Sequence, residues 1–429
     1  MPATTDNNCG RLILDPKCFE RLLPFAGMSL RNLAEEHSGL IVYPPSGSTS
    51  DEADKLCIFS IDPRTRALST GNLMGFIGID DCELAIRSRF DTVEKDHFIY
   101  HMLARVFCPS IVDLPHGSAH EMGPDLLPFL FPGMLADALR QGVYKEYITE
   151  EHNDSRIRGR IDVPRHIRHN IPFIGNVAYN SRTLCFDNDL TQLIRHTIER
   201  LRSGSIGRYI LSSDHSVIRD IDTIVECTPD YSPGALHRIV SKNLSRTVTH
   251  PYFSAYSPLQ ELCLMILDRE MLRSGTHERK IHGILFDGAW LWEEYLAHIL
   301  LPLGFEHPRN KERIGDRPLF TNDKYKRYID FHKPGIVADA KYKRINPDQI
   351  DRDDLHQLIT YIHMEKASIG LFIHPSSETR IKTIGELHGQ GGAVAVLSIK
   401  IPVTDTYADF IRAMDGEEHH VRTLIGQLL

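Results

Sequence analysis

The segment Tyr328-Ile-Asp-Phe-His-Lys-Pro-Gly-Ile-Val-Ala-Asp-Ala-Lys341 predicts two short apolar strands joined by a turn at Pro334-Gly335. Such a hairpin sets Asp330 near the end of one strand and Asp339 on its neighbour. Because side chains alternate along a strand, Asp339 and Lys341 share one face. Two carboxylates and a lysine can therefore converge at one point of a sheet.

These residue types suit metal-dependent cleavage of a phosphodiester. Carboxylates are hard oxygen ligands for Mg²⁺, and a nearby lysine can orient water or stabilise charge that builds on a phosphate. The spacing alone is weak, because acid-x-lysine also occurs at Asp15-Pro-Lys17 and Glu278-Arg-Lys280. Only the pair Asp339 and Lys341 lies in a small, apolar strand that follows an acid across a turn. An ordinary surface ion pair is the alternative interpretation.

Two flanking segments supply further polar groups. Residues 354–361 are predicted to be helical, and Gln357 and Tyr361, four residues apart, lie on one face of that helix. Upstream, Glu293 and Glu294 lie on a helix of apolar character. One of the two is expected to point inward as a third acid, and a solvated acidic pair is the alternative.

The whole chain of 429 residues is long enough for several domains and predicts a multidomain α+β protein. Residues 1–115 are expected to form a β-rich N-terminal domain and residues 116–254 a mainly helical middle region. Residues 255–429 alternate helix, strand, strand, helix and strand, which is typical of an α/β domain with a mixed sheet.

Individual elements follow from the spacing of apolar residues. Helices are expected around 97–107, 126–139, 190–201, 259–267, 290–301 and 351–364, with Asp187 or Asn188 as the N-cap of the third. Strands are expected around 71–79, 84–90, 329, 336–340, 369–373 and 393–399.

Charge is uneven along the chain. The net charge of −8 argues against a protein that coats nucleic acid through bulk charge. However, residues 305–344 carry eleven Lys or Arg against six acids, a net charge of +5, and residues 156–168 carry five Arg against one acid. Each window is a candidate phosphate-facing surface or a solvated face.

Other classes of protein are excluded by what the sequence lacks. No apolar run approaches the roughly 18 residues of a membrane span, and the start of the chain does not resemble a signal peptide, so a cytoplasmic location is expected. The eight cysteines form no Cys-x-x-Cys pair and are expected to be free thiols. No Gly-x-x-x-x-Gly-Lys-Ser/Thr loop occurs, so nucleotide hydrolysis would need a partner.

The order of these motifs resembles the PD-(D/E)xK nuclease core of the RecB-like branch. The motifs are, in sequence order, the Glu293/Glu294 helix, Asp330, Asp339-Ala-Lys341 and Gln357-x-x-x-Tyr361. Within that superfamily the chain resembles the McrC family, the nuclease subunits of McrBC-type 5-methylcytosine-specific restriction systems. That resemblance extends upstream to Gly71–Phe90, Arg158-Gly-Arg-Ile-Asp162, Asn170-x-Pro-Phe173 and Asp187-Asn188.

The resemblance implies a role for each motif residue and a cofactor, Mg²⁺. The implied metal ligands are Asp330 and Asp339 with Glu294, the catalytic lysine is Lys341, and the supporting or DNA-contacting residues are Gln357 and Tyr361.

The resemblance also implies partners. These are an McrB-like AAA+ GTPase ring, which such a subunit stimulates, and double-stranded DNA containing modified cytosine, with no membrane. The N-terminal domain would engage the ring, and the window 156–168 would contact the ring or DNA, or stabilise the local fold. Two rival hypotheses are a stand-alone RecB-like nuclease and a non-catalytic adaptor that stimulates a partner NTPase.

Overall fold

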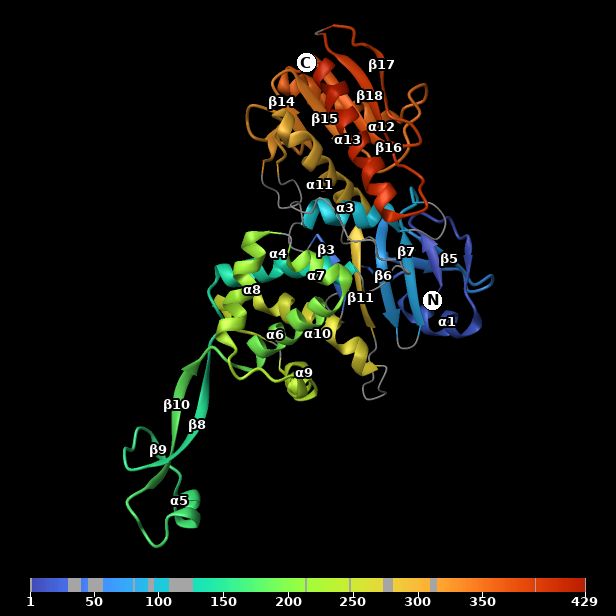
Figure 1. Ribbon diagram of the computed structural model, residues 1–429. Coiled ribbons are helices and arrows are strands. Elements are labelled where there is room, and N and C mark those ends of the chain that lie inside the picture. Colours follow the sequence, from blue (N-terminus) through green and yellow to red (C-terminus); the bar gives the residue numbers. More distant parts are fainter. Residues whose placement is uncertain are drawn as a thin grey trace. The chain divides into compact units, whose positions relative to one another are not determined.

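The computed structural model describes residues 2–29, 40–44, 57–79, 82–91, 96–107, 126–212, 214–246, 248–272, 281–308, 315–389 and 391–428 (Figure 1). The chain divides into two compact units, one of Met1–Leu130 with Thr276–Leu429 and one of Phe131–Gly275. The two ends of the chain therefore fold together. The expected mixture of helices and mixed sheets over several domains is confirmed, and the functional division at 115 and 254 stays a prediction.

The N-terminal part of the first unit contains a five-stranded sheet. Its strands, in spatial order, are β1 (Ala3–Thr5), β7 (Cys82–Arg87), β6 (Leu73–Ile79), β11 (Ile281–Asp287) and β3 (Leu40–Tyr43). A second sheet contains β2 (Leu12–Ile13), β5 (Ala67–Thr70) and β4 (Phe59–Ile61), and the helices are α1 (Pro16–Leu22) and α3 (His97–Phe107). The strands predicted at 71–79 and 84–90 and the helix predicted at 97–107 are confirmed.

Strand β11 joins this sheet from more than 200 residues away in the sequence, antiparallel to β6. Two glycines make the close approach possible. A Cβ at Gly75 would lie 2.0 Å from the Ile284 carbonyl oxygen, and one at Gly283 would lie 2.3 Å from the Phe76 carbonyl oxygen. Any larger residue at either position would force the two strands apart.

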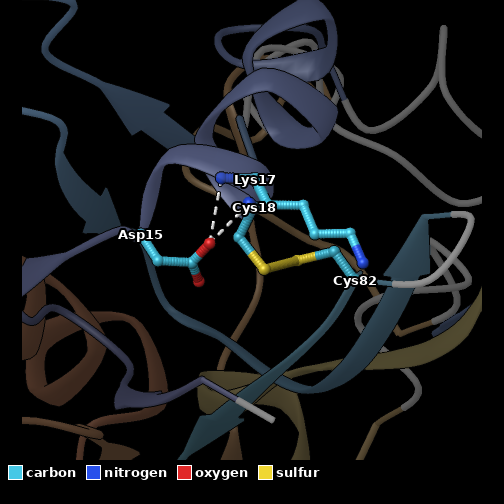
Figure 2. The surroundings of a disulfide bond; sticks show 4 residues. All are labelled: Asp15, Lys17, Cys18 and Cys82. Carbon is cyan, nitrogen blue, oxygen red and sulfur yellow. Dashed lines mark hydrogen bonds between the residues drawn. A yellow bond between two sulfur atoms is a disulfide. The ribbon is translucent and has the colours of Figure 1, made fainter.

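The expectation that all cysteines are free is wrong for one pair. Cys18 on α1 and Cys82 on β7 form a disulfide, with their Cα atoms 5.5 Å apart (Figure 2). Both residues are buried in the core between helix and sheet, and Asp15 caps α1 by accepting from the backbone N–H of Lys17 and Cys18. The sequence separation of 64 residues hides this proximity from any spacing rule, because only the packing of α1 on the sheet creates it.

The C-terminal part of the same unit is built on a second five-stranded sheet. Its strands, in spatial order, are β14 (Phe331–Lys333), β15 (Ile336–Ala340), β16 (Ile369–Ser376), β18 (Ala393–Lys400) and β17 (Arg380–Glu386). The three central strands are parallel, and the two outer strands are antiparallel to their neighbours. The predicted mixed sheet is therefore confirmed.

Three helices accompany this sheet: α11 (Gly288–Leu300), α12 (Arg352–Glu365) and α13 (Tyr407–Leu428). Leu358 and Ile362 of α12 pack with Val337 and Phe372 of the sheet in one buried cluster. The helices expected at 290–301 and 351–364 are confirmed within one or two residues, whereas β17 and α13 were not predicted. A short ribbon of β12 (Arg317–Pro318) and β13 (Lys326–Arg327) precedes β14.

The second unit is mainly helical, as expected for the middle of the chain. Its helices are α6 (Asp189–Ser203), α7 (Ser205–Leu211), α8 (His215–Cys227), α9 (Leu236–Leu244) and α10 (Tyr256–Leu272), and α4 (Leu127–Arg140) leads into them. Of the two predicted N-caps, Asn188 is the one that caps α6, because its side chain accepts from the backbone N–H of Leu190 and Thr191.

A long β-hairpin corrects the helical prediction for residues 146–185, a segment called the arm below. Strands β8 (Glu146–Asp154) and β10 (Val177–Cys185) pair over nine positions, and β9 (Arg160–Ile161) and α5 (Val163–His169) lie near its tip. Figure 1 shows the arm extending away from helices α6 to α10 of its unit. Both faces of β8 are at least partly exposed, so the apolar alternation that reveals a strand is weak there.

No helix in the described ranges is long and apolar enough to cross a membrane.

Candidate functional site

The β14–β15 hairpin brings the two predicted acids together. Phe331 pairs with Ala338, so Asp330 and Asp339 occupy the next facing positions at the open end of the hairpin. The carboxylate of Asp330 also accepts from the backbone N–H of Ala340, with 2.8 Å between Oδ2 and N. The turn predicted at Pro334-Gly335 is confirmed, with Gly335 in the left-handed region at φ 89°.

Lys341 lies just beyond β15 and extends its pairing, because its backbone N–H donates to the Ile373 carbonyl of β16. Its Nζ lies 2.8 Å from Asp339 Oδ2 and 3.4 Å from Asp354 Oδ1. The same Nζ donates a 2.8 Å hydrogen bond to Gln357 Oε1. One ammonium group therefore connects the strand to helix α12.

Helix α12 continues this chain of hydrogen bonds. Gln357 Nε2 donates to Tyr361 Oη at 2.8 Å, and Tyr361 Oη donates to the carbonyl oxygen of Tyr328 at 2.7 Å. The path returns to the segment that carries Asp330. Gln357 accepts from Lys341 and donates to Tyr361, which donates in turn to the backbone of Tyr328. These bonds fix the position of Lys341 relative to both acids.

Burial and mutual repulsion set the electrostatics of the two acids. Asp339 is 1% exposed, and this burial, followed by the charge of Asp330, raises its pKa to about 7 against the opposing charge of Lys341. Burial lowers the pKa of Lys341, but the charges of Asp339, Asp354 and Asp330 outweigh it, so the net shift is upward. The pKa of Tyr361 is raised by burial and by both acids.

The donor set fits a magnesium ion held by two carboxylates. Asp339 Oδ2 is buried, and apart from its 2.8 Å ion pair with Lys341 it accepts no hydrogen bond from the described residues. Mg²⁺ commonly binds one or two carboxylates, keeps several waters and takes further oxygens from a substrate phosphate. In the described part of the chain, no group of three His, Cys, Asp or Glu side chains is arranged to hold a metal.

Glu294, the predicted third acid, lies on α11 beside His307 rather than in such a group. The distance from Glu294 Oε1 to His307 Nε2 is 3.6 Å, and Glu293 Oε1 lies 3.9 Å from His307 Nδ1. His307 Nδ1 donates to the backbone carbonyl of Asp330 at 2.8 Å, and its ring stacks on Phe331. The histidine therefore links the acidic helix to the hairpin.

Sequence reasoning missed two residues of this cluster, His307 and Asp354. Asp354 lies three residues before Gln357 and seven before Tyr361, so helical spacing could have placed it on the same face. His307 is an isolated histidine in the sequence, and only tertiary packing brings it to Asp330. Burial lowers the pKa of His307, but Glu294 and Asp330 outweigh it and raise it overall.

Part of the basic window 305–344 is neutralised by acids. Lys343 pairs with Asp354 at 2.6 Å and Lys326 with Asp316 at 2.5 Å. Arg309, Lys311 and Arg313 lie outside the described residues. In the window 156–168, Arg165 has a structural role, because its guanidinium donates to the carbonyls of His152 and Tyr179 across the arm.

Comparison with known proteins supplies the family context. A family model described as McrBC 5-methylcytosine restriction system component matches residues 68–375. No curated protein matches the chain.

Two solved structures align with the chain. A chain of the refined half-complex from the tetradecameric assembly of Thermococcus gammatolerans McrB AAA+ hexamers with bound McrC aligns with 12% identity and a TM-score of 0.53, over 100% of this chain and 99% of that one. A chain of the cryo-EM structure of the T. gammatolerans McrBC complex aligns with 12% identity and a TM-score of 0.34, over 70% and 87% of the two chains. At this identity, the first alignment indicates a shared fold.

Proposed function

The chain belongs to the family of McrBC 5-methylcytosine restriction system components, and from this membership we propose that it is the McrC-type endonuclease subunit. In this proposal the C-terminal sheet is a PD-(D/E)xK core that hydrolyses DNA with Mg²⁺. Cleavage requires docking on an McrB-like AAA+ GTPase, which the subunit stimulates and which recognises modified cytosine. The observation that carries the proposal is the convergence of Asp330, Asp339 and Lys341 at the end of one hairpin.

Each residue has a physical task in this proposal. Asp330 and Asp339 would hold the Mg²⁺, whose positive charge would lower the pKa of a bound water and stabilise the phosphate's developing charge. The two acids repel each other when both are ionised, because the charge of Asp330 raises the pKa of Asp339, so a bound cation favours the ionised pair. Lys341 donates to Gln357 and keeps an ammonium beside the acids, where it can stabilise a phosphate oxygen.

Glu294 keeps a secondary role in this proposal. Through His307 it orients the backbone of Asp330 and adds negative charge at the margin of the site. Gln357 and Tyr361 support Lys341 from α12, and DNA contact by either side chain is the remaining expectation from the family pattern.

The arm supports the partner in the proposal. Seven large apolar side chains between 157 and 174 are exposed on it, including Phe173 at 64% and Ile174 at 76%. An exposed apolar surface of this kind on a soluble fold favours protein docking over DNA binding. We assign the arm to the McrB-like ring, alongside the N-terminal region that the family resemblance predicts to engage it.

The first test is cleavage of methylated and unmethylated plasmid with Mg²⁺, with and without the candidate GTPase and GTP. Wild type should cut methylated plasmid only with the partner, whereas Asp339→Asn should lose cutting by at least about 100-fold because one metal-binding carboxylate is gone. Asp348→Asn is the matched control, since Asp348 is an exposed aspartate of the same sheet domain that pairs with Lys382.

The rival functions give different results in this assay. Cutting by the isolated chain favours a stand-alone nuclease. Stimulation of the GTPase with no cutting by wild type favours the non-catalytic adaptor. Full cutting by Asp339→Asn contradicts the site proposed here.

A further inference from the structure

Residues 341–344 alternate between two sets of partners. Lys341 and Lys343 both pair with Asp354 of α12. The residues between and after them turn to the N-terminal region, with the Tyr342 ring 5.0 Å from the Phe90 ring and the Arg344 guanidinium 5.9 Å from it. The residue that directly follows the site lysine is therefore held by a segment more than 240 residues earlier in the sequence.

The side chain of Tyr342 is enclosed by that region. It is 5% exposed, and its Oη lies 2.7 Å from Ser88 Oγ and donates to Met74 Sδ at 3.1 Å. The ring also occupies the space beside Gly288, where a Cβ would lie 2.8 Å from Tyr342 Cε1. The fit leaves the ring little room to move, because backbone and buried side chains surround it.

Arg89 holds Tyr342 from a second direction. Its Nη2 donates to the Tyr342 backbone carbonyl, and its guanidinium lies 4.9 Å from the centre of the Tyr342 ring. Asp6 fixes the arginine in turn, because this fully buried acid accepts from the Arg89 backbone N–H at 2.6 Å and lies 3.3 Å from Nη1. The N-terminal region thus contacts both the side chain and the backbone of Tyr342.

We propose that Tyr342 and Arg89 are positioning residues that keep Lys341 against Asp339 and Gln357. Adjacent Cα atoms are joined by one rigid peptide unit, so a shift of Tyr342 is carried directly to Lys341. The inference rests on the proposed nuclease function and deepens it. The N-terminal region, expected to engage the ring, becomes part of the structure that holds the site lysine in place.

The test uses the full chain and a Tyr342→Phe variant, which keeps the ring but loses the hydroxyl contacts with Ser88 and Met74. Tyr256→Phe is the matched control, because Tyr256 is also buried and its Oη donates to the Gly142 carbonyl in the other unit. Thermal unfolding establishes that both variants fold. Ser88→Ala removes the same hydrogen bond from the other side and replaces Tyr342→Phe if that protein is unstable.

The first readout does not depend on catalysis. Amine acylation of Lys341, quantified by mass spectrometry relative to Lys400, should become severalfold faster in Tyr342→Phe than in wild type or Tyr256→Phe, because the lysine leaves its partners. The second readout is DNA cleavage with the GTPase partner. There kcat should fall about tenfold in Tyr342→Phe while KM for DNA stays unchanged, the result expected when a catalytic group is misplaced.

The outcomes separate the two proposals. Wild-type labelling and kcat in a folded Tyr342→Phe protein overturn the positioning role and leave the nuclease proposal standing. If the wild-type complex cuts no DNA, the nuclease proposal fails, and the labelling result alone decides whether Tyr342 holds Lys341.

Discussion

At the level of single residues, Asp354 offers a comparison between two lysines. Lys341 and Lys343 both pair with this carboxylate, but only Lys341 also contacts Asp339 and Gln357. The side chain of Lys343 is 50% exposed, whereas that of Lys341 is 16% exposed. The two lysines therefore share one ion-pair partner but differ in their other contacts and in their exposure.

Replacing Lys341 with Met should lower kcat for DNA cleavage by about 100- to 1,000-fold, the usual cost of removing one preorganised charge from a site. Lys343→Met, the matched control, should stay within about threefold of wild type, because exposed ion pairs contribute little. Single-turnover cleavage with the partner present measures both. Equal losses in the two variants would mean that any positive charge beside Asp354 supports cleavage, whatever the position of Lys341.

At the level of elements, the arm is held together by pairing and by Arg165 rather than by an apolar core. Strand β8 has no buried residue and β10 buries only Ala178 and Tyr179, while Arg165 bonds to carbonyls on each strand. An element of this kind has few buried contacts of its own, so its surface can change without loss of the fold.

The double substitution Phe173→Ser with Ile174→Ser should therefore reduce stimulation of the GTPase by at least about tenfold, because an apolar anchor of the proposed interface is removed. The free energy of unfolding should change by less than about 0.5 kcal/mol. Val403→Ser is the control, since Val403 is an equally exposed apolar residue outside the arm. Full stimulation by the arm variant would assign docking to the N-terminal region instead.

At the level of the whole molecule, a buried carboxylate joins helices from both ends of the chain. Glu418 of α13, which is 2% exposed, lies 2.9 Å from His101 Nε2 of α3 and accepts a 2.9 Å hydrogen bond from Tyr295 Oη of α11. Burial raises the pKa of Glu418, but hydrogen bonding and charge from His101, with Arg105 and Tyr295, outweigh it and lower the pKa to about 2.

The sign of this shift predicts acid sensitivity. A carboxylate whose pKa is lower in the folded state stabilises the fold above its unfolded pKa of about 4.3 and loses that contribution as pH falls toward 2. Urea unfolding should show wild type about 2–3 kcal/mol more stable than Glu418→Gln at pH 6, with the difference vanishing near pH 2. Glu417→Gln, one residue away and outside this cluster, is the control. A difference that stays constant with pH would contradict the prediction.

Local chemistry explains what the sequence alone determined. Interactions within a few residues determine three of the observed features, and apolar spacing and turn residues indicate such interactions directly. These features are the hairpin that carries Asp330 and Asp339, helix α12 with Gln357 and Tyr361, and the N-cap at Asn188. The mixed C-terminal sheet was predictable for the same reason. The family membership also agrees with the motif order.

Only the tertiary structure decided the contacts between segments distant in the sequence. Four such contacts join residues that share no local pattern. They are the Cys18–Cys82 bond, the pairing of β11 in the N-terminal sheet, the contact of His307 with Asp330 and the enclosure of Tyr342 by Ser88 and Arg89. The arm was hidden because β8 is at least partly exposed on both faces, which leaves only a weak apolar alternation in its sequence. Such contacts depend on the packing of whole elements, which a pattern of neighbouring residues does not contain.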